Sequence, residues 1–391
     1  MTHLETDLDN RMPRFVGGPP DPGAILAQKH VTVVGGGSVG LAAICHLARA
    51  GVGALTIVDR GKLKAASVKT HPIEPSAVGE WKAEYAGQVA RAIHPEIHVE
   101  THSAAFQDLP IAFLDCDAVV LAVDNLGTEV DVTTRCINQG LLHLHCAVHG
   151  GTMVATVRTL TGGEHGEGPC IACNYNAAEW QQIALEPRYS CDGVGEVRSL
   201  APTQSLSSLC SLAAELGVHK LLRHLVGFGV PLSDGVLEYR GHTDELVNTA
   251  VRRNPDCPVD HVRWAQAERS EAESLAEVLG RVALGRDATV EVDGRVFAER
   301  AACGCGATPT VGRFVDSAEA LGGCPRCGKE LQHSPFHERR AVPAAELGTA
   351  ALTGSSASLG VPAGSAIVVR DRAELATLVR AKARNSTGGM V

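Results

Sequence analysis

The sequence predicts a doubly wound, mostly parallel α/β sheet with a second, smaller domain toward the C-terminus. Three observations support this fold class. Apolar strand patterns alternate with helical patterns between His30 and Val148, as in parallel sheets that carry helices on both faces. A glycine-rich turn follows the first of these strands. Two pairs of closely spaced cysteines lie between Cys303 and Cys327.

The elements are predicted in chain order as follows. Residues 1–29 are rich in Pro and Gly and are expected to form an irregular arm. Residues 30–262 are expected to form the sheet domain, with strands beginning at His30, Ala54, Ile97, Ala118 and Leu142 and helices up to about residue 50 and over 75–92, 128–139 and 202–225. In the smaller domain, 263–391, a helix is predicted over 264–284 and a hairpin over 287–299, turning at Asp293 and Gly294.

Composition excludes several classes of partner. The 391 residues include 35 Lys and Arg against 44 Asp and Glu, a net charge of −9, and 4% aromatic residues. This balance argues against nucleic acid. The longest apolar runs are far shorter than the roughly 20 residues that cross a bilayer, and the polar first ten residues lack a signal-peptide core. We therefore expect no membrane partner, a cytoplasmic location, and thirteen cysteines that are reduced or bind metal.

The glycine-rich turn has the pattern of a nucleotide site. Gly35, Gly37 and Gly40 form GxGxxG between the first strand and the next helix, where backbone N–H groups face an anionic phosphate. Asp59 ends the following strand, about 20 residues on, and its carboxylate can accept hydrogen bonds from ribose hydroxyls. NAD and ATP fit these features equally, so an NAD-dependent oxidoreductase is an open alternative at this point.

A series of short motifs resembles the ThiF/MoeB/HesA family, the prokaryotic relatives of ubiquitin-activating enzymes. The motifs stand in the family's order and cover about residues 11–261. They are LARAGVG at 47–53, LTIVD at 55–59, VGEWK at 78–82, AVDN at 122–125, GPCIAC at 168–173, SCDGVG at 190–195, APT at 201–203 and NPDCP at 254–258.

The resemblance implies a Rossmann-like adenylation domain that acts as a homodimer. It implies that ATP and Mg²⁺ activate the C-terminal carboxylate of a small ubiquitin-like or sulfur-carrier protein, or of a peptide. Lys82 matches the family's phosphate-contacting lysine, Asp124 its Mg²⁺-binding aspartate and Asp59 its ribose-binding acid. Arg14, or failing that Arg11, resembles the arginine that the neighbouring subunit presents to the triphosphate. Such groups suit phosphoryl transfer, which depends on positioning and electrostatic stabilisation.

One segment departs from the family pattern. Where the family has an Asn and an Arg that bind the β- and γ-phosphates, this sequence has Ser67 and Thr70. A hydroxyl cannot replace the bidentate contact of a guanidinium, although Lys69 or His71 could supply a cation from beside it. The alternative function is a zinc-stabilised, non-catalytic partner-binding subunit whose nucleotide site has decayed.

Cys191 lies in the run SCDGVG, which is similar to a family segment whose cysteine bonds covalently to the partner. A nucleophilic thiol needs access and a lowered pKa. Arg188 and the neighbouring glycines permit both. The resemblance therefore implies transfer of the activated group to Cys191, and the alternative is an inert buried thiol.

Two groups of residues have the spacing of structural zinc sites. The resemblance implies that Cys170 and Cys173 pair with a distant CPxC, but here Cys257 is followed by Asp260 at the expected position of the second thiolate. We expect the adjacent His261 to complete the site, because zinc accepts either donor.

The second group predicts a four-cysteine zinc ribbon over 303–328. Its ligands are Cys303, Cys305, Cys324 and Cys327. A closed site of four thiolates has no open position for chemistry, so its role is to stabilise the fold. A different expectation concerns His143 and His145, which alternate along one strand and are expected to face a partner or the sheet edge rather than a metal.

Overall fold

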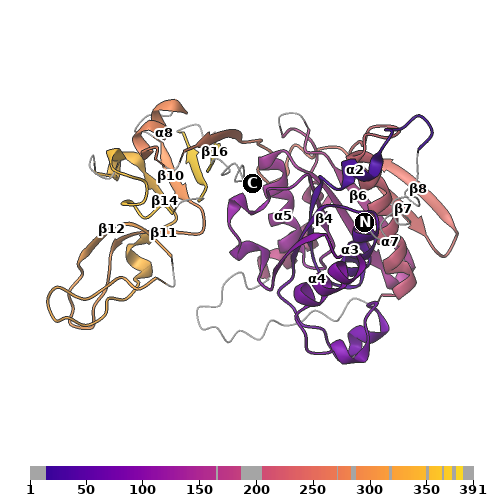
Figure 1. The fold of residues 1–391 in the computed structure, drawn as a ribbon, viewed down its shortest axis with the longest axis horizontal. Helices are drawn as coiled ribbons and strands as arrows, with labels where there is room; N and C mark the ends of the chain where they lie inside the picture. Colours follow the sequence, from indigo (N-terminus) through magenta and orange to yellow (C-terminus); the bar gives the residue numbers. More distant parts are fainter. Residues whose placement is uncertain are drawn as a thin grey trace, which may run out of the picture. The chain divides into compact units, whose positions relative to one another are not determined.

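In a computed structural model of the chain, residues 15–163, 166–185, 205–270, 272–282, 288–316, 319–348, 352–362, 365–371 and 376–381 are described. The chain divides into two compact units (Figure 1). The first comprises residues 1–108 and 114–263, and the second comprises residues 109–113 and 264–391. Each unit is described by itself below.

The first unit is built on an eight-stranded sheet in the order β3-β2-β1-β4-β5-β6-β7-β8. The strands from β3 to β5 are parallel, and the last three are antiparallel. This order confirms the predicted doubly wound class. The strands are β1 (His30–Val34), β2 (Ala54–Val58), β3 (His98–His102), β4 (Ala118–Leu121), β5 (Leu142–His149), β6 (Val154–Leu160), β7 (Gly235–Arg240) and β8 (Glu245–Ala250).

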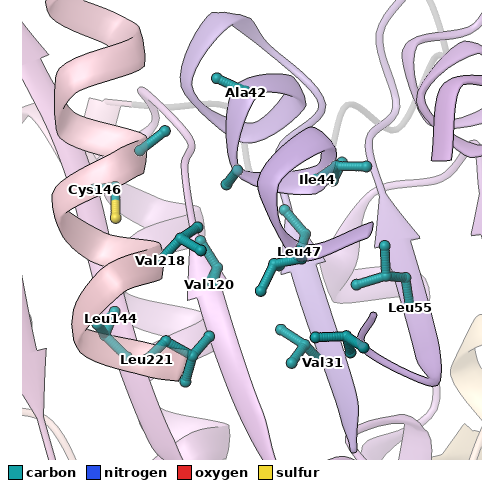
Figure 2. Packing of buried hydrophobic residues seen from close by; sticks show 14 of the residues in the cluster. Val31, Ala42, Ile44, Leu47, Leu55, Val120, Leu144, Cys146, Val218 and Leu221 are labelled. Carbon is teal, nitrogen blue, oxygen red and sulfur yellow. The ribbon is translucent and has the colours of Figure 1, made fainter. Parts of the chain in front are cut away.

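Helices cover both faces of this sheet. On one face, α3 (Ser38–Arg49), α4 (Lys82–Ile93) and α7 (Ser207–Leu225) share a buried apolar cluster with the strands. Figure 2 shows Leu47 of α3 near Val31 of β1, and Leu221 of α7 near Leu144 of β5. On the other face lies α5 (Leu126–Gln139), and α6 (Ala177–Leu185) packs against it. Among the described residues, no helix combines the length and apolar character that crossing a bilayer requires.

Two expectations for this unit were wrong in their details. Residues 22–26, expected in an irregular arm, form α2 (Pro22–Leu26), because Asp21 Oδ1 accepts the Ala24 N–H at 2.9 Å and Leu26 is buried in the core. The helix predicted over 75–92 begins only at Lys82, because Pro75–Ala77 form a 3-10 turn and Gly79 then takes a φ of +101°.

The expectation for the two strand histidines was also wrong. His143 and His145 are buried, because α5 covers that face of β5. The Nε2 atom of His143 lies 2.6 Å from Thr133 Oγ1. The Nε2 atom of His145 lies 3.5 Å from a carboxylate oxygen of Glu129, whose other oxygen accepts the Tyr175 hydroxyl at 2.5 Å.

The second unit contains two smaller sheets. One has the order β14-β10-β15-β16-β9 and the other β12-β11-β13, and α8 (Leu275–Arg281) packs into the apolar cluster of the first. The strands are β9 (Ala265–Arg269), β10 (Thr289–Val292), β11 (Val296–Arg300), β12 (Thr310–Val315), β13 (Glu338–Arg339), β14 (Ala341–Pro343), β15 (Ile367–Arg370) and β16 (Ala376–Ala381).

Both predicted elements of this unit need correction. The helix predicted over 264–284 is a strand, β9, followed by the short α8, because β9 pairs in parallel with the distant β16. The turn at Asp293 and Gly294 is present, since Gly294 has a φ of +69°. Its two strands do not pair as a hairpin, however. The first strand, β10, lies between β14 and β15 in the five-stranded sheet. The second, β11, lies between β12 and β13 in the three-stranded sheet.

Candidate nucleotide site and metal centres

The glycine turn lies where β1 and β4 end. A Cβ on Gly35, whose φ is +103°, would meet the Ala122 carbonyl oxygen at 2.4 Å, and a Cβ on Gly40 would meet the Gly35 oxygen at 1.7 Å. These two glycines are therefore required by close backbone approach. The strand order reverses between β1 and β4, which is where doubly wound sheets bind their ligands.

The N-terminus of α3 faces this turn without a side-chain partner. Its N-cap, Gly37, supplies no capping side chain, and the first turn contains no acidic residue. The first N–H groups of a helix have no acceptor within the helix, and the helix dipole favours a negative charge beside them. The turn therefore fits a phosphate group.

Asp59 ties two backbone loops together at the same edge. Its Oδ2 accepts the Gly36 N–H and its Oδ1 accepts the Gly61 N–H, each at 2.7 Å. Each carboxylate oxygen has a second lone pair, so these bonds leave acceptor capacity for ribose hydroxyls. Ribose binding by Asp59 stays a prediction.

The side chain of Lys82 lies along the glycine turn. It is the first residue of α4, and its backbone N–H donates to the Gly61 oxygen at 2.9 Å. A Cβ on Gly36 would lie 3.3 Å from Lys82 Cβ, and one on Gly61 would lie 3.7 Å from both Cδ and Cε. The half-buried stem therefore brings an ammonium group to the region where a phosphate would lie.

Asp124 follows β4 just after Ala122 and Val123, which lie against Gly35. Its side chain is exposed, whereas the neighbouring Asn125 is occupied as the N-cap of α5, with its Oδ1 accepting the Thr128 N–H at 2.8 Å. Mg²⁺ in nucleotide sites is held by one or two carboxylates together with phosphate oxygens and water. The exposed carboxylate of Asp124 fits that donor set.

The segment that departs from the family pattern folds as a 3-10 turn, η1 (Ala65–Lys69). Ser67 is 7% exposed, and its Oγ accepts the Lys64 N–H at 3.1 Å. Its hydroxyl is therefore engaged within the turn. Thr70 places its Oγ1 2.9 Å from Nδ1 of His71 rather than toward the glycine turn. Nucleotide binding by Ser67 stays a prediction.

His71 is a site residue whose placement the sequence did not reveal. Its Nδ1 lies 3.0 Å from Ser38 Oγ at the start of α3. Burial first and the charge of Lys82 second lower its pKa to about 4, against the opposing effects of Asp59 and Ser67. The ring is therefore neutral near pH 7, so His71 is not the free cation considered from the sequence.

Two further predicted residues lie outside the described residues. They are Arg14, expected to reach the triphosphate of a neighbouring subunit, and Cys191, expected to accept the activated group. Their roles stay predictions.

Cys170, Cys173, Cys257 and His261 come together in one cluster of the first unit. Cys170 Sγ lies 3.7 Å from Cys173 Sγ and 3.6 Å from Cys257 Sγ, and Cys173 Sγ lies 3.6 Å from His261 Nε2. A tetrahedral ion about 2.3 Å from each sulfur would separate two sulfurs by about 3.8 Å. The cluster therefore fits zinc.

The surroundings of this cluster also suit a metal. His261 Nδ1 lies 2.9 Å from the Gly168 carbonyl oxygen, which fixes the ring with Nε2 toward the sulfurs. Hydrogen bonds from Cys170 and His261 lower the pKa of the Cys173 thiol, which favours the thiolate that a metal binds. Asp260 is not in the cluster, because it faces Asn138, whose amide lies 3.4 Å from the carboxylate.

Cys303, Cys305, Cys324 and Cys327 form the second cluster. The Cys303 and Cys327 sulfurs lie 3.5 Å apart, and those of Cys305 and Cys324 lie 3.8 Å apart. The Arg326 N–H donates to Cys324 Sγ at 3.4 Å and is the main cause that lowers the pKa of the Cys324 thiol. This geometry also fits a tetrahedral zinc ion.

The fold and the glycine turn define the class of protein, a Rossmann-like α/β protein with a glycine-rich loop at the switch point of its sheet. The chain belongs to the ThiF family, whose profile matches residues 18–259. The family resemblance expected from the motifs is thereby confirmed.

Three relatives show what the chain is similar to. The SAMP-activating enzyme E1 of Haloferax volcanii is 29% identical over 62% of this chain and 83% of its own length. The molybdopterin-synthase adenylyltransferase of Escherichia coli is 27% identical over 60% of this chain and 88% of its own. The sulfur carrier protein adenylyltransferase of Thermus thermophilus is 28% identical over 60% of this chain and 83% of its own. The expectation of a ThiF-type enzyme is confirmed at the level of the family.

Proposed function

We propose that the chain uses ATP to adenylylate the C-terminal carboxylate of a small ubiquitin-like or sulfur-carrier protein, or of a peptide. One observation carries the proposal. The uncapped N-terminus of α3 stands beside the stem of Lys82 and the carboxylate of Asp59 at the end of the parallel strands. The names of the three relatives, all activating enzymes or adenylyltransferases, support ATP over a nicotinamide as the nucleotide.

The residues suit each part of this reaction. A carboxylate oxygen of the partner attacks the α-phosphorus, the bond from that phosphorus to the bridging oxygen breaks, and an acyl adenylate and pyrophosphate form. Lys82 and the N–H groups of α3 stabilise the negative charge on the phosphates. Asp124 would hold Mg²⁺, which supplies further neutralisation of phosphate charge when it is bound.

We assign both clusters to structural zinc, one ion in each. Neither tetrahedral set leaves an open coordination position, so the ions stabilise the fold rather than take part in adenylylation. Reduced thiols are needed for both, which is the reason to place the reaction in the cytoplasm.

Two further parts of the proposal concern residues outside the described ranges. After adenylylation, the sulfur of Cys191 attacks the acyl carbon, a thioester forms and AMP leaves. A homodimer would bring Arg14 of one subunit to the triphosphate of the other. A reductant-sensitive conjugate that disappears in Cys191→Ser tests the first part, and the mass of the protein in solution tests the second.

ATP–pyrophosphate exchange with candidate carrier proteins or peptides tests the central step. Wild type should catalyse exchange, and so should the control Lys64→Ala, which changes an exposed lysine. In Lys82→Ala the exchange rate should fall at least about 100-fold, the effect of removing one group that stabilises the transition-state charge. Nucleotide binding without exchange would instead favour a non-catalytic partner-binding subunit. The Ser67 hydroxyl, which is bonded within its own turn, is the observation in favour of that alternative. A change in nicotinamide absorbance would favour an oxidoreductase.

A further inference from the structure

Residues 67–70 lack the guanidinium that the family pattern carries in this segment. Ser67 and Thr70 stand where phosphate-binding side chains were expected, and the structure turns both hydroxyls toward their own segment. The next residue, His71, is different, because its ring reaches the helix that follows the glycine turn.

Two hydroxyls hold the His71 ring by one edge. Ser38 Oγ lies 3.0 Å from Nδ1 and Thr70 Oγ1 lies 2.9 Å from the same atom. The backbone N–H of His71 donates to the Ser67 oxygen at 2.7 Å, which fixes the main chain as well. The ring therefore has a defined orientation relative to α3.

The opposite edge of the ring has no such partner. Nε2 is buried, and among the described residues it has no hydrogen-bond partner. A Cβ placed on Gly37 would lie 3.8 Å from Nε2, so this atom faces the N-cap of α3. An unpaired buried polar atom is costly, and a ligand with an oxygen at this place would satisfy it.

The protonation of the ring suits an anionic ligand. Near pH 7 the ring is neutral and carries one N–H, because burial and Lys82 lower its pKa to about 4. A hydroxyl that donates to Nδ1 leaves the ring proton on Nε2. Nε2–H then points toward the N-terminus of α3, where Lys82 also supplies positive charge.

We propose that His71 binds a phosphate oxygen of ATP through Nε2–H, with Thr70 as the positioning residue that holds the ring. The proposal rests on the proposed function, because it needs ATP at the glycine turn. It explains how a chain without a guanidinium in this segment can still contact the triphosphate. The contact is a single neutral donor rather than a bidentate cation.

Equilibrium binding to the full-length protein tests the proposal, with Mg²⁺ present and with ATP and adenosine as ligands. His71→Phe keeps a ring of similar shape and removes the donor, so ATP affinity should fall at least about tenfold, the effect of losing a hydrogen bond to a charged group, while adenosine affinity stays unchanged. His71→Gln keeps an N–H donor and should regain most of the ATP affinity. His98→Phe, an exposed histidine of the same unit, is the matched control.

The role of Thr70 has its own test. Thr70→Val should weaken ATP binding about threefold without changing adenosine binding, and Thr70→Ser, which keeps the hydroxyl, should restore ATP binding.

The proposal is overturned if His71→Phe binds ATP as wild type does, or if this substitution weakens ATP and adenosine binding equally. If Lys82→Ala loses ATP binding while His71→Phe keeps it, the proposal for His71 fails but the proposed function is still supported. A wild-type protein that binds no ATP would contradict both the proposal for His71 and the proposed function.

Discussion

Two glycines of the GxGxxG motif, Gly37 and Gly40, differ in whether they tolerate a side chain. A Cβ on Gly40 would lie 1.7 Å from the Gly35 oxygen, whereas one on Gly37 would lie no closer than 3.8 Å to His71. Gly40→Ala should therefore destabilise the first unit by more than about 3 kcal/mol, a fall of about 10 °C in Tm. Gly37→Ala should melt within about 2 °C of wild type. Calorimetry checks both, and equal Tm values would refute the close approach.

His143 should make stability depend on pH. Its ring is fully buried, and burial is the main cause that lowers its pKa to about 4 from the ordinary 6.5. The unfolded chain therefore binds more protons between these values, so stability falls as the pH falls from about 6.5 to 4. Below about pH 6, wild type should lose about 1.4 kcal/mol more per pH unit than His143→Gln. Denaturant unfolding at several pH values measures the slopes, and equal slopes would contradict the assignment.

For individual residues, the positions of some candidate site residues could be predicted from the sequence, whereas the contacts of others could not. Gly35 and Asp59 could be placed because each stands at a fixed point of a strand–turn–helix pattern, whereas Lys82 could be placed only through the family resemblance of the VGEWK motif. The contact between Ser38 and His71 could not, because it joins residues 33 positions apart through the tertiary path of a 3-10 turn. The burial of His145 was missed for a similar reason, since only the covering helix α5 decides which strand face is buried.

Metal analysis can count the ions held by the two clusters that we assign to zinc. The full chain should carry about two zinc ions, and Cys324→Ala should carry about one. In the first cluster, His261→Gln should lose its ion, whereas Asp260→Asn should keep it because Asp260 faces Asn138 instead. Elemental analysis of the purified variants gives these values. Two ions in Cys324→Ala would refute the ribbon, and loss in Asp260→Asn would refute the choice of His261.

Regular elements were predictable where their pattern is local. The strands and helices of the parallel sheet show clear apolar alternation, and their order then fixes a doubly wound fold. The errors are non-local. The β9 strand has mostly exposed residues and pairs with β16, more than 100 residues away. The β10 and β11 strands flank a good turn but belong to different sheets, which no local signal reveals.

For the whole molecule, the candidate nucleotide site belongs to one of the two units. Every residue placed around the glycine turn lies in the first unit. ATP with Mg²⁺ should therefore slow hydrogen exchange in residues 30–60 and 118–140, by a factor that grows with ATP concentration. Residues 288–316 should exchange at an unchanged rate. Mass spectrometry of peptic peptides measures this, and protection confined to the second unit would contradict the location.

The central claim is that ATP occupies the glycine turn. Equilibrium binding of ATP with Mg²⁺ and of NAD⁺ to the full-length chain tests it most directly, because the turn and Asp59 alone fit both. The account predicts saturable binding of about one ATP per chain, weakened at least tenfold in Lys82→Ala, and no competition by NAD⁺. Binding of NAD⁺ in preference to ATP, or ATP binding that Lys82→Ala leaves intact, would contradict it.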